Sequence, residues 1–143
     1  GTTSPTIATL DRILKGLGTD LTDFFSNNSN GIDLSPVFPA KECQSISDGA
    51  REYIYLFPKR SDLKFRMMNE SIDPAEKQAE WETHSYDLGG TIVSGGPATL
   101  EIEDQGKWSV KKGDSYYIKA GLRHRLINNG KRPVQQITVI ASG

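Results

Sequence analysis

The chain has 143 residues, of which 36% are hydrophobic and 24% are charged, a composition typical of one folded domain rather than a disordered segment. Its 17 basic and 18 acidic residues give a formal charge of -1, which argues against the chain gripping nucleic acid unaided. No apolar run approaches the roughly 20 residues that span a bilayer, and no signal peptide is visible. The single cysteine, Cys43, has no partner for an intramolecular disulfide, which favours a reducing cytoplasm.

The first part of the chain predicts two short α-helices. Residues 6–17 carry apolar side chains at helical spacing, with Thr6 as the N-cap and Gly18 placed to end the helix. Asp20 caps a second amphipathic segment that extends over residues 20–25. Neither helix can bury its apolar face alone, so we expect both to dock on another part of the protein.

A polar stretch at residues 26–35 has the composition of a linker, and beyond it the apolar period changes from helical spacing to two. Apolar and polar residues alternate over residues 63–67, 98–102 and 108–110, with Gly and Asn residues between these runs. Residues 53–57 and 137–140 are instead apolar on both faces, as in strands covered on both sides. Residues 75–81 favour a loop. Many short strands with regular turns predict an antiparallel sandwich or barrel.

Three residues of this region could meet inside such a barrel. Glu82 and His84 are two apart, so in a strand they share a face, and His124 shares a face with Leu126. Two imidazoles and a carboxylate suit zinc, iron(II) or manganese. The spacing by itself favours two unrelated histidines, because a separation of about 40 residues has no intrinsic meaning for a metal.

The residues around His124 carry a family resemblance. They match the second cupin motif except that Lys119 replaces its proline, and the matching positions are Gly113, Gly121, His124 and Asn128. Glu82, Thr83 and His84, followed by Gly95, align more loosely with the first cupin motif. The resemblance covers residues 52–142. It implies a mainly β fold, a single cupin double-stranded β-helix (jelly-roll barrel) of two antiparallel sheets, here preceded by the two short helices.

The resemblance also implies a metal site, with departures from the family. His84 and His124 stand unchanged among the family's four ligands, Glu82 replaces a histidine, and Leu88 replaces the glutamate. We therefore expect zinc, iron or manganese on Glu82, His84, His124 and the neighbouring Asp87. The alternative is a cupin that has lost its metal, needs no cofactor and uses the cavity for an organic ligand. The residues expected to bind that ligand are Glu82, His84, Tyr86 and His124.

The N-terminal helices carry a second resemblance. Residues 4–25 resemble the end of an Xre/Cro-type helix-turn-helix domain, and a cupin directly behind it is the architecture of Xre-family transcriptional regulators. This implies a helix-turn-helix remnant at residues 1–26, a linker and first strands at 27–50, and the cupin at 51–143. The family's recognition helix lies before the point where this chain begins. We therefore expect these residues alone not to bind an operator.

Together these resemblances predict the cytoplasmic effector-sensing domain of a bacterial transcriptional regulator, which is not an enzyme and has no catalytic residues. Its expected partners are a small-molecule effector, a second copy in a homodimer, and DNA through the missing N-terminal helices, with no membrane. The first alternative is a metal-dependent cupin enzyme of the dioxygenase or isomerase type that uses Glu82, His84 and His124. The second is a structural or storage cupin without a ligand.

The last third of the chain is rich in basic residues, which form either a phosphate-facing patch or, more in keeping with nearby acids, a solvated face. The acids are Glu101, Glu103 and Asp104. The basic residues are Lys107, Lys111, Lys112, Lys119, Arg123, Arg125, Lys131 and Arg132. Tyr116 and Tyr117 are adjacent on one predicted strand, so one should point inward and the other outward.

Overall fold

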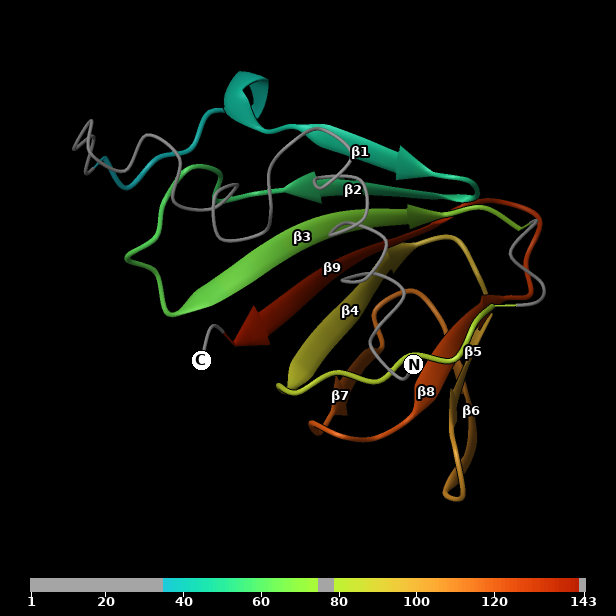
Figure 1. The fold of residues 1–143 in the computed structure, drawn as a ribbon. Helices are drawn as coiled ribbons and strands as arrows, with labels where there is room; N and C mark the ends of the chain where they lie inside the picture. The colour runs from blue at the N-terminus through green and yellow to red at the C-terminus, as the bar shows by residue number, and fades with distance from the viewer. Residues whose placement is uncertain (1–34, 75–78, 142–143) are drawn as a thin grey trace.

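The computed structural model describes residues 35–74 and 79–141, which form nine strands and the short 3-10 helix η2 (Ala40–Glu42) (Figure 1). The strands are β1 (Ser45–Asp48), β2 (Arg51–Tyr55), β3 (Phe65–Ile72), β4 (Leu88–Ser94), β5 (Ala98–Ile102), β6 (Gly106–Val110), β7 (Ser115–Ile118), β8 (His124–Asn128) and β9 (Val134–Ala141). The helices predicted within residues 6–25 lie outside the described residues. No helix in the described part is long and apolar enough to cross a membrane.

The strands form two antiparallel sheets, as predicted. The larger sheet has six strands in the order β1-β2-β3-β9-β4-β7, and the smaller sheet has three in the order β6-β5-β8. Figure 1 shows the larger sheet running from β1 to β7, with β5, β6 and β8 grouped beside its lower half. The long pairing of β3 with β9 joins the first strands to the last one, so the C-terminal strand lies inside the larger sheet.

The core lies between the two sheets and consists of the side chains on the inward face of each strand. On β5 the alternation places Ala98, Leu100 and Ile102 inside, as predicted, and Leu100 lies opposite Leu126 of β8. On β6 only Val110 of the predicted pair is buried, because Trp108 remains 46% exposed on this edge strand. The apolar cluster is completed by both sheets, with Ile72, Leu88, Ile92, Ile118, Val134 and Ile140 from the larger one.

Strand β3 differs from the predicted run at residues 63–67. Phe65 is 47% exposed and packs on Phe57 with ring centroids 5.8 Å apart, whereas Arg66 is buried. The buried face of β3 has the opposite phase, since Arg66, Met68, Glu70 and Ile72 point inward. Each inward position is set by the pairing of β3 with β2 and β9, and a shift of one residue would move every side chain to the other face. The guanidinium of Arg66 donates to the carbonyl oxygens of Leu63 and Phe65.

Strand β9 carries polar side chains into the interior. Gln136 and Thr138 are 3% and 1% exposed, and they alternate with half-buried residues on the outer face of the strand. They share the inward face with Val134 and Ile140. The larger sheet thus brings both apolar and polar groups to the space between the sheets.

Candidate functional site

The site is built on a direct backbone pairing between Glu82 and His124. Each backbone N–H donates to the other residue's carbonyl oxygen, at 2.7 Å from Glu82 and 2.9 Å from His124. This bridge places the segment before β4 alongside β8. The side chains meet as well, because His124 Nε2 lies 3.3 Å from Glu82 Oε2 and both residues are more than nine-tenths buried.

His84 and Tyr86 lie next to this pair. The His84 ring makes an edge-to-face contact with His124 at 5.2 Å between centroids and stacks on Tyr86 at 5.4 Å. Burial lowers the pKa of His84, with a smaller opposing contribution from its hydrogen bond to the Tyr86 carbonyl. The structure therefore brings together Glu82, His84, Tyr86 and His124, the four residues expected to bind a ligand.

Asp87 does not join this group. Its carboxylate accepts a hydrogen bond from the backbone N–H of Ala120 at 2.9 Å and another from the hydroxyl of Tyr117. These bonds, the Tyr117 one first, lower the pKa of Asp87. The next residue, Leu88, instead turns its side chain toward the interior and lines the cavity.

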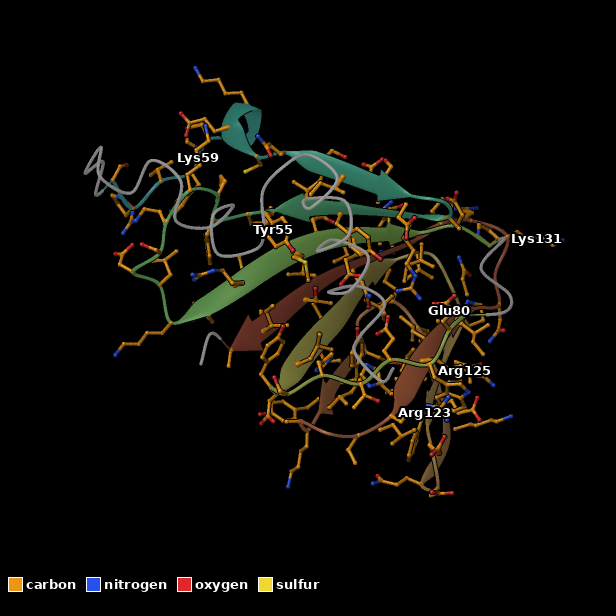
Figure 2. All side chains as sticks on the ribbon, in the orientation of Figure 1. Tyr55, Lys59, Glu80, Arg123, Arg125 and Lys131 are labelled. Carbon is orange, nitrogen blue, oxygen red and sulfur yellow. The ribbon has the colours of Figure 1, made fainter. Side chains whose placement is uncertain are left out.

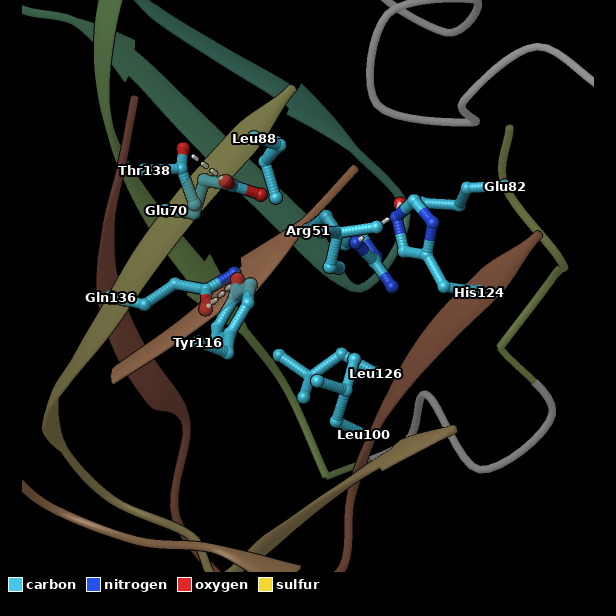
Figure 3. A pocket seen from close by; sticks show the side chains of 11 residues that line it. Arg51, Glu70, Glu82, Leu88, Leu100, Tyr116, His124, Leu126, Gln136 and Thr138 are labelled. Carbon is cyan, nitrogen blue, oxygen red and sulfur yellow. Dashed lines mark hydrogen bonds and ion pairs between the residues drawn. The ribbon is translucent and has the colours of Figure 1, made fainter. Parts of the chain in front are cut away.

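A cavity lies between the two sheets beside Glu82 and His124 (Figure 3). Its volume is about 20 Å³, which is room for roughly one water molecule. The larger sheet lines it with both polar and apolar residues, and the smaller sheet adds mainly leucines. The lining residues are Arg51, Glu70, Glu82, Leu88, Leu100, Tyr116, Ile118, His124, Leu126, Gln136 and Thr138.

Charged groups are concentrated in this cavity. A guanidinium nitrogen of Arg51 lies 3.6 Å from Glu82 Oε1, and Figure 3 shows Arg51 next to both Glu82 and His124. Deeper in the barrel, Thr138 Oγ1 lies 2.6 Å from Glu70 Oε2. Burial raises the pKa of Glu70, against the lowering effects of the Thr138 hydrogen bond and the charge of Arg51.

A tyrosine completes the polar lining. The hydroxyl of Tyr116 donates to Gln136 Oε1 at 2.8 Å, and burial raises the pKa of Tyr116 well above its ordinary value. Tyr116 reaches Gln136 across β4 because Gly90 lies between them and any Cβ there would collide with the tyrosine ring. The neighbouring Tyr117 is 63% exposed, so Tyr116 is the inward residue of the pair.

Four polar residues of this lining were missed by the sequence analysis, namely Arg51, Glu70, Gln136 and Thr138, whereas Tyr116 was predicted as one of two candidates for an inward position. A usable signal exists for three of them. Glu70 lies in phase with Met68 and Ile72 on β3, and Gln136 and Thr138 lie in phase with the buried ends of β9. A polar residue on the apolar face of a strand indicates a functional or hydrogen-bonded interior position. Arg51 has no comparable signal, since it begins its strand beside a turn.

Both imidazoles are oriented in the same way. The Nδ1 atoms of His84 and His124 each lie 2.9 Å from a backbone carbonyl oxygen, that of Tyr86 and that of Leu122 respectively. We therefore place the proton on Nδ1 in each ring, an arrangement that orients an imidazole for metal binding through its Nε2 atom. The His84 Nε2 atom is buried without a hydrogen-bond partner.

The remaining groups do not fit a resident metal. Across residues 35–74 and 79–141, no group of three or more His, Cys, Asp and Glu side chains is arranged to hold a metal ion. Glu82 is already paired with the permanent cation Arg51, which opposes a second cation nearby. The fourth ligand position carries the apolar Leu88. The metal predicted on Glu82, His84, His124 and Asp87 stays a prediction.

The Glu82 carboxylate contacts two other residues of the cavity. Its Oε1 lies 3.6 Å from the guanidinium of Arg51, and its Oε2 lies 3.3 Å from the imidazole of His124. We call Arg51, Glu82 and His124 the charged cluster.

Two antiparallel sheets that enclose a buried polar cavity define a jelly-roll barrel of the double-stranded β-helix type. Residues 68–140, which are 73 of the 143 residues, match the family described as "Cupin domain". The chain belongs to the cupin family.

Solved cupin structures have the same fold. An RmlC-like cupin from Shewanella frigidimarina is 12% identical with a TM-score of 0.61, over 76% of this chain and 92% of its own. Fe(II) HppE is 16% identical with a TM-score of 0.64, over 94% of this chain and 75% of its own. A mutant oxalate decarboxylase of Bacillus subtilis is 17% identical with a TM-score of 0.61, over 74% of this chain and 29% of its own. At these identities the likeness shows the fold alone. No curated protein matches the chain.

Proposed function

We propose that this cupin is the effector-sensing domain of a bacterial transcriptional regulator and binds a small polar molecule at the cavity. The observation that carries the proposal is the charged cluster of Arg51, Glu82 and His124 inside the barrel. Burying a charged group costs roughly several kcal/mol unless the group is well paired. Packed apolar residues in its place often stabilise a core equally well. Stability alone therefore does not explain the charged cluster, whereas binding of a polar ligand does.

The small size of the cavity supports a sensing role. With room for about one water molecule, it accepts an organic effector only if the lining side chains or the segments carrying them move apart. Binding is then coupled to a change of shape. A ligand shifts a conformational equilibrium only when it binds the two states with different affinity, and an effector larger than this cavity would bind only the state in which the lining has moved apart.

The resemblance of residues 4–25 to a helix-turn-helix domain supports the regulatory part of the proposal. In this arrangement the effector would bias the spacing or orientation of two DNA-binding heads in a homodimer. The coding sequence immediately before Gly1 tests this directly. A helix-turn-helix encoded there supports the regulator, and a gene without one contradicts it.

A metal-dependent cupin enzyme is the second candidate. The orientation of both imidazoles, with Nε2 left as the lone-pair nitrogen, favours it. The pairing of Glu82 with Arg51 and the apolar Leu88 in the fourth ligand position oppose it. Product formation from a candidate substrate, followed by mass spectrometry, separates this enzyme from a sensor that releases its ligand unchanged.

The binding experiment is a thermal-shift screen of the chain with small carboxylates and small amines, followed by calorimetry on each compound that stabilises it. We expect Glu82→Gln to weaken binding about tenfold or more, because a hydrogen bond to a charged group contributes about 1.5–3 kcal/mol. The matched control is Glu103→Gln, whose carboxylate pairs with Arg123 on the surface and should leave affinity unchanged. Stabilising compounds that bind both variants equally would contradict binding at this cavity.

A further inference from the structure

The basic residues of the last third divide into two groups in the structure. Glu101 pairs with Arg125 at 2.8 Å and Lys107 at 4.0 Å, and Glu103 pairs with Arg123 at 2.5 Å. These acids neutralise the basic residues on the outer face of the smaller sheet. Within the described part of the chain, no ion pair neutralises the other five, which are Lys111, Lys112, Lys119, Lys131 and Arg132.

Three of these five cations, Lys112, Lys131 and Arg132, line one groove. It has a volume of about 470 Å³ and lies where the β4–β5 turn meets the β8–β9 loop. Its lining consists of Gly95, Gly96, Pro97, Lys112, Gly130, Lys131 and Arg132, with no acidic side chain among them. No residue of this groove lines the cavity of Arg51 and Glu82, so the two sites are separate. Figure 2 shows Lys131 at the outer edge of the molecule, with its side chain extending away from the sheets.

The loop that carries Lys131 and Arg132 is held in place by Asn128. This side chain is 3% exposed, and its amide nitrogen donates to the carbonyl oxygens of Arg132 and Ile72, each at 2.9 Å. Its amide oxygen accepts from the backbone N–H of Gly130 at 2.8 Å. The two cations are therefore presented by a fixed loop, which lowers the entropy cost of holding a ligand between them.

Glycines let the two sides of the groove approach each other. The backbone N–H of Asn129 donates to the Pro97 carbonyl oxygen at 2.9 Å. A Cβ at Gly130 would collide with the carbonyl of Gly96. The wall between the loops is consequently backbone, and the cationic side chains stand beside it with open space between them.

We propose that this groove binds a phosphate group through Lys112, Lys131 and Arg132. A guanidinium matches two phosphate oxygens at once, and two ammonium groups supply further donors and positive charge. The phosphate comes either from a free phosphorylated compound or from the backbone of a nucleic acid. Both sources present the same tetrahedral anion, and the experiment separates them.

The first arm titrates the ¹⁵N-labelled chain with sodium pyrophosphate at constant ionic strength and follows the backbone amide signals. We expect the largest shifts at Gly96, Gly130 and Lys131. The groove variant is Lys112→Gln/Lys131→Gln/Arg132→Gln, which should weaken binding about tenfold or more, since three charged contacts are removed. The control is Lys41→Gln/Lys59→Gln/Lys64→Gln, which makes the same change of net charge. Figure 2 shows Lys59 on the side of the molecule opposite Lys131.

The second arm measures binding of a fluorescent DNA duplex of arbitrary sequence to the same three proteins at several salt concentrations. Three phosphate contacts predict a slope of about -2.7 for the logarithm of the binding constant against the logarithm of salt concentration. Pyrophosphate binding without duplex binding assigns the groove to a free phosphorylated compound. Duplex binding with this slope, lost in the groove variant and kept in the control, assigns it to nucleic acid. Equal losses in both variants, or no binding of either probe, would overturn the proposal.

Discussion

The two sheets face the same interior but bring different side chains to it. The larger sheet contributes Arg51, Glu70, Tyr116, Gln136 and Thr138 to the cavity. The smaller sheet contributes Leu100 and Leu126, with His124 as its one polar lining residue in the described chain. The larger sheet adds the apolar Leu88 and Ile118, so its side of the cavity, the polar half, carries most of the polar lining, and the side of the smaller sheet, the apolar half, is mainly leucine.

The difference shows how a barrel interior tolerates polar groups. On the larger sheet, Thr138 of β9 donates a hydrogen bond to Glu70 of β3, and Tyr116 of β7 donates one to Gln136 of β9. Strands of one sheet hold their inward side chains at short, regular distances, so polar groups there can satisfy one another. His124 lies at the edge of the smaller sheet and finds its partner in Glu82, outside any strand.

The largest effect should come from breaking the charged cluster. Glu82→Ala leaves Arg51 buried without its carboxylate, and we expect a loss of about 3–5 kcal/mol in the free energy of unfolding, measured with urea. Glu103→Ala removes an exposed carboxylate paired with Arg123 and should cost less than about 1 kcal/mol. Similar losses in the two variants would mean that the cluster is not desolvated.

Substitutions in the apolar half should change the free energy of unfolding through packing alone. Leu126→Ala removes a buried side chain opposite Leu100, and we expect a loss of about 2–4 kcal/mol in the free energy of unfolding. The same truncation at Val93, which is 48% exposed, should change stability by less than about 0.5 kcal/mol. A small loss in Leu126→Ala would show that the smaller sheet collapses onto the cavity.

The buried carboxyl of Glu70 should make stability depend on pH. Burial raises its pKa in the folded protein above the ordinary value of 4.5, so the unfolded chain releases this proton first as pH rises. The contribution of Glu70 to stability then falls as pH rises from about 4.5 to the raised pKa, and it stays constant above that pKa because the carboxyl is then ionised in both states.

Glu70→Gln should remove this fall while keeping the shape of the side chain. The measurement is the midpoint of urea unfolding from pH 4 to pH 8 for both proteins. Glu52→Gln, an exposed position on β2, is the control and should follow the wild type. If the curves of wild type and Glu70→Gln run parallel, folding does not raise the pKa of Glu70.

Removal of metal should have the smallest effect. A metal present at 100 times its dissociation constant would stabilise the fold by about 2.7 kcal/mol, which is several degrees in Tm. Because Arg51 already neutralises Glu82, we expect chelator to shift Tm by less than about 1 °C.

Elemental mass spectrometry on protein never exposed to chelator checks the same point, beside His84→Ala/His124→Ala. About one metal per chain, lost in the double variant, would contradict this expectation and favour the metal-dependent enzyme. The variant Arg51→Met, which removes the guanidinium beside the carboxylate of Glu82, should bind zinc more tightly than the wild type.

Much of the site could be predicted from the sequence. The motif around His124 identified the cupin, which the family match at residues 68–140 confirms. The shared face of Glu82 and His84 allowed these side chains to meet His124, although the spacing by itself favoured unrelated histidines, and in the structure the three lie together. The apolar alternation of β5 was sufficient because this strand is paired on both edges and buries every second side chain toward the interior. The helix-turn-helix remnant and the effector remain predictions.

The rest depended on long-range pairing. The phase of β3 was wrong in the sequence analysis because Phe65 packs outside the barrel on Phe57, so hydrophobicity there does not indicate the core. Arg51 reaches Glu82 across 31 positions of sequence (82 − 51), and no local pattern encodes such a contact.

The sequence by itself determined the elements and the chemistry available: short alternating strands, two histidines and a nearby glutamate, because these follow from local periodicity and residue type. Only the tertiary structure decided what that chemistry became. Strand order placed Arg51 beside Glu82 and Leu88 in the fourth ligand position. It also left three cations unpaired at a glycine-lined groove, because charges are neutralised by neighbours in space rather than along the chain.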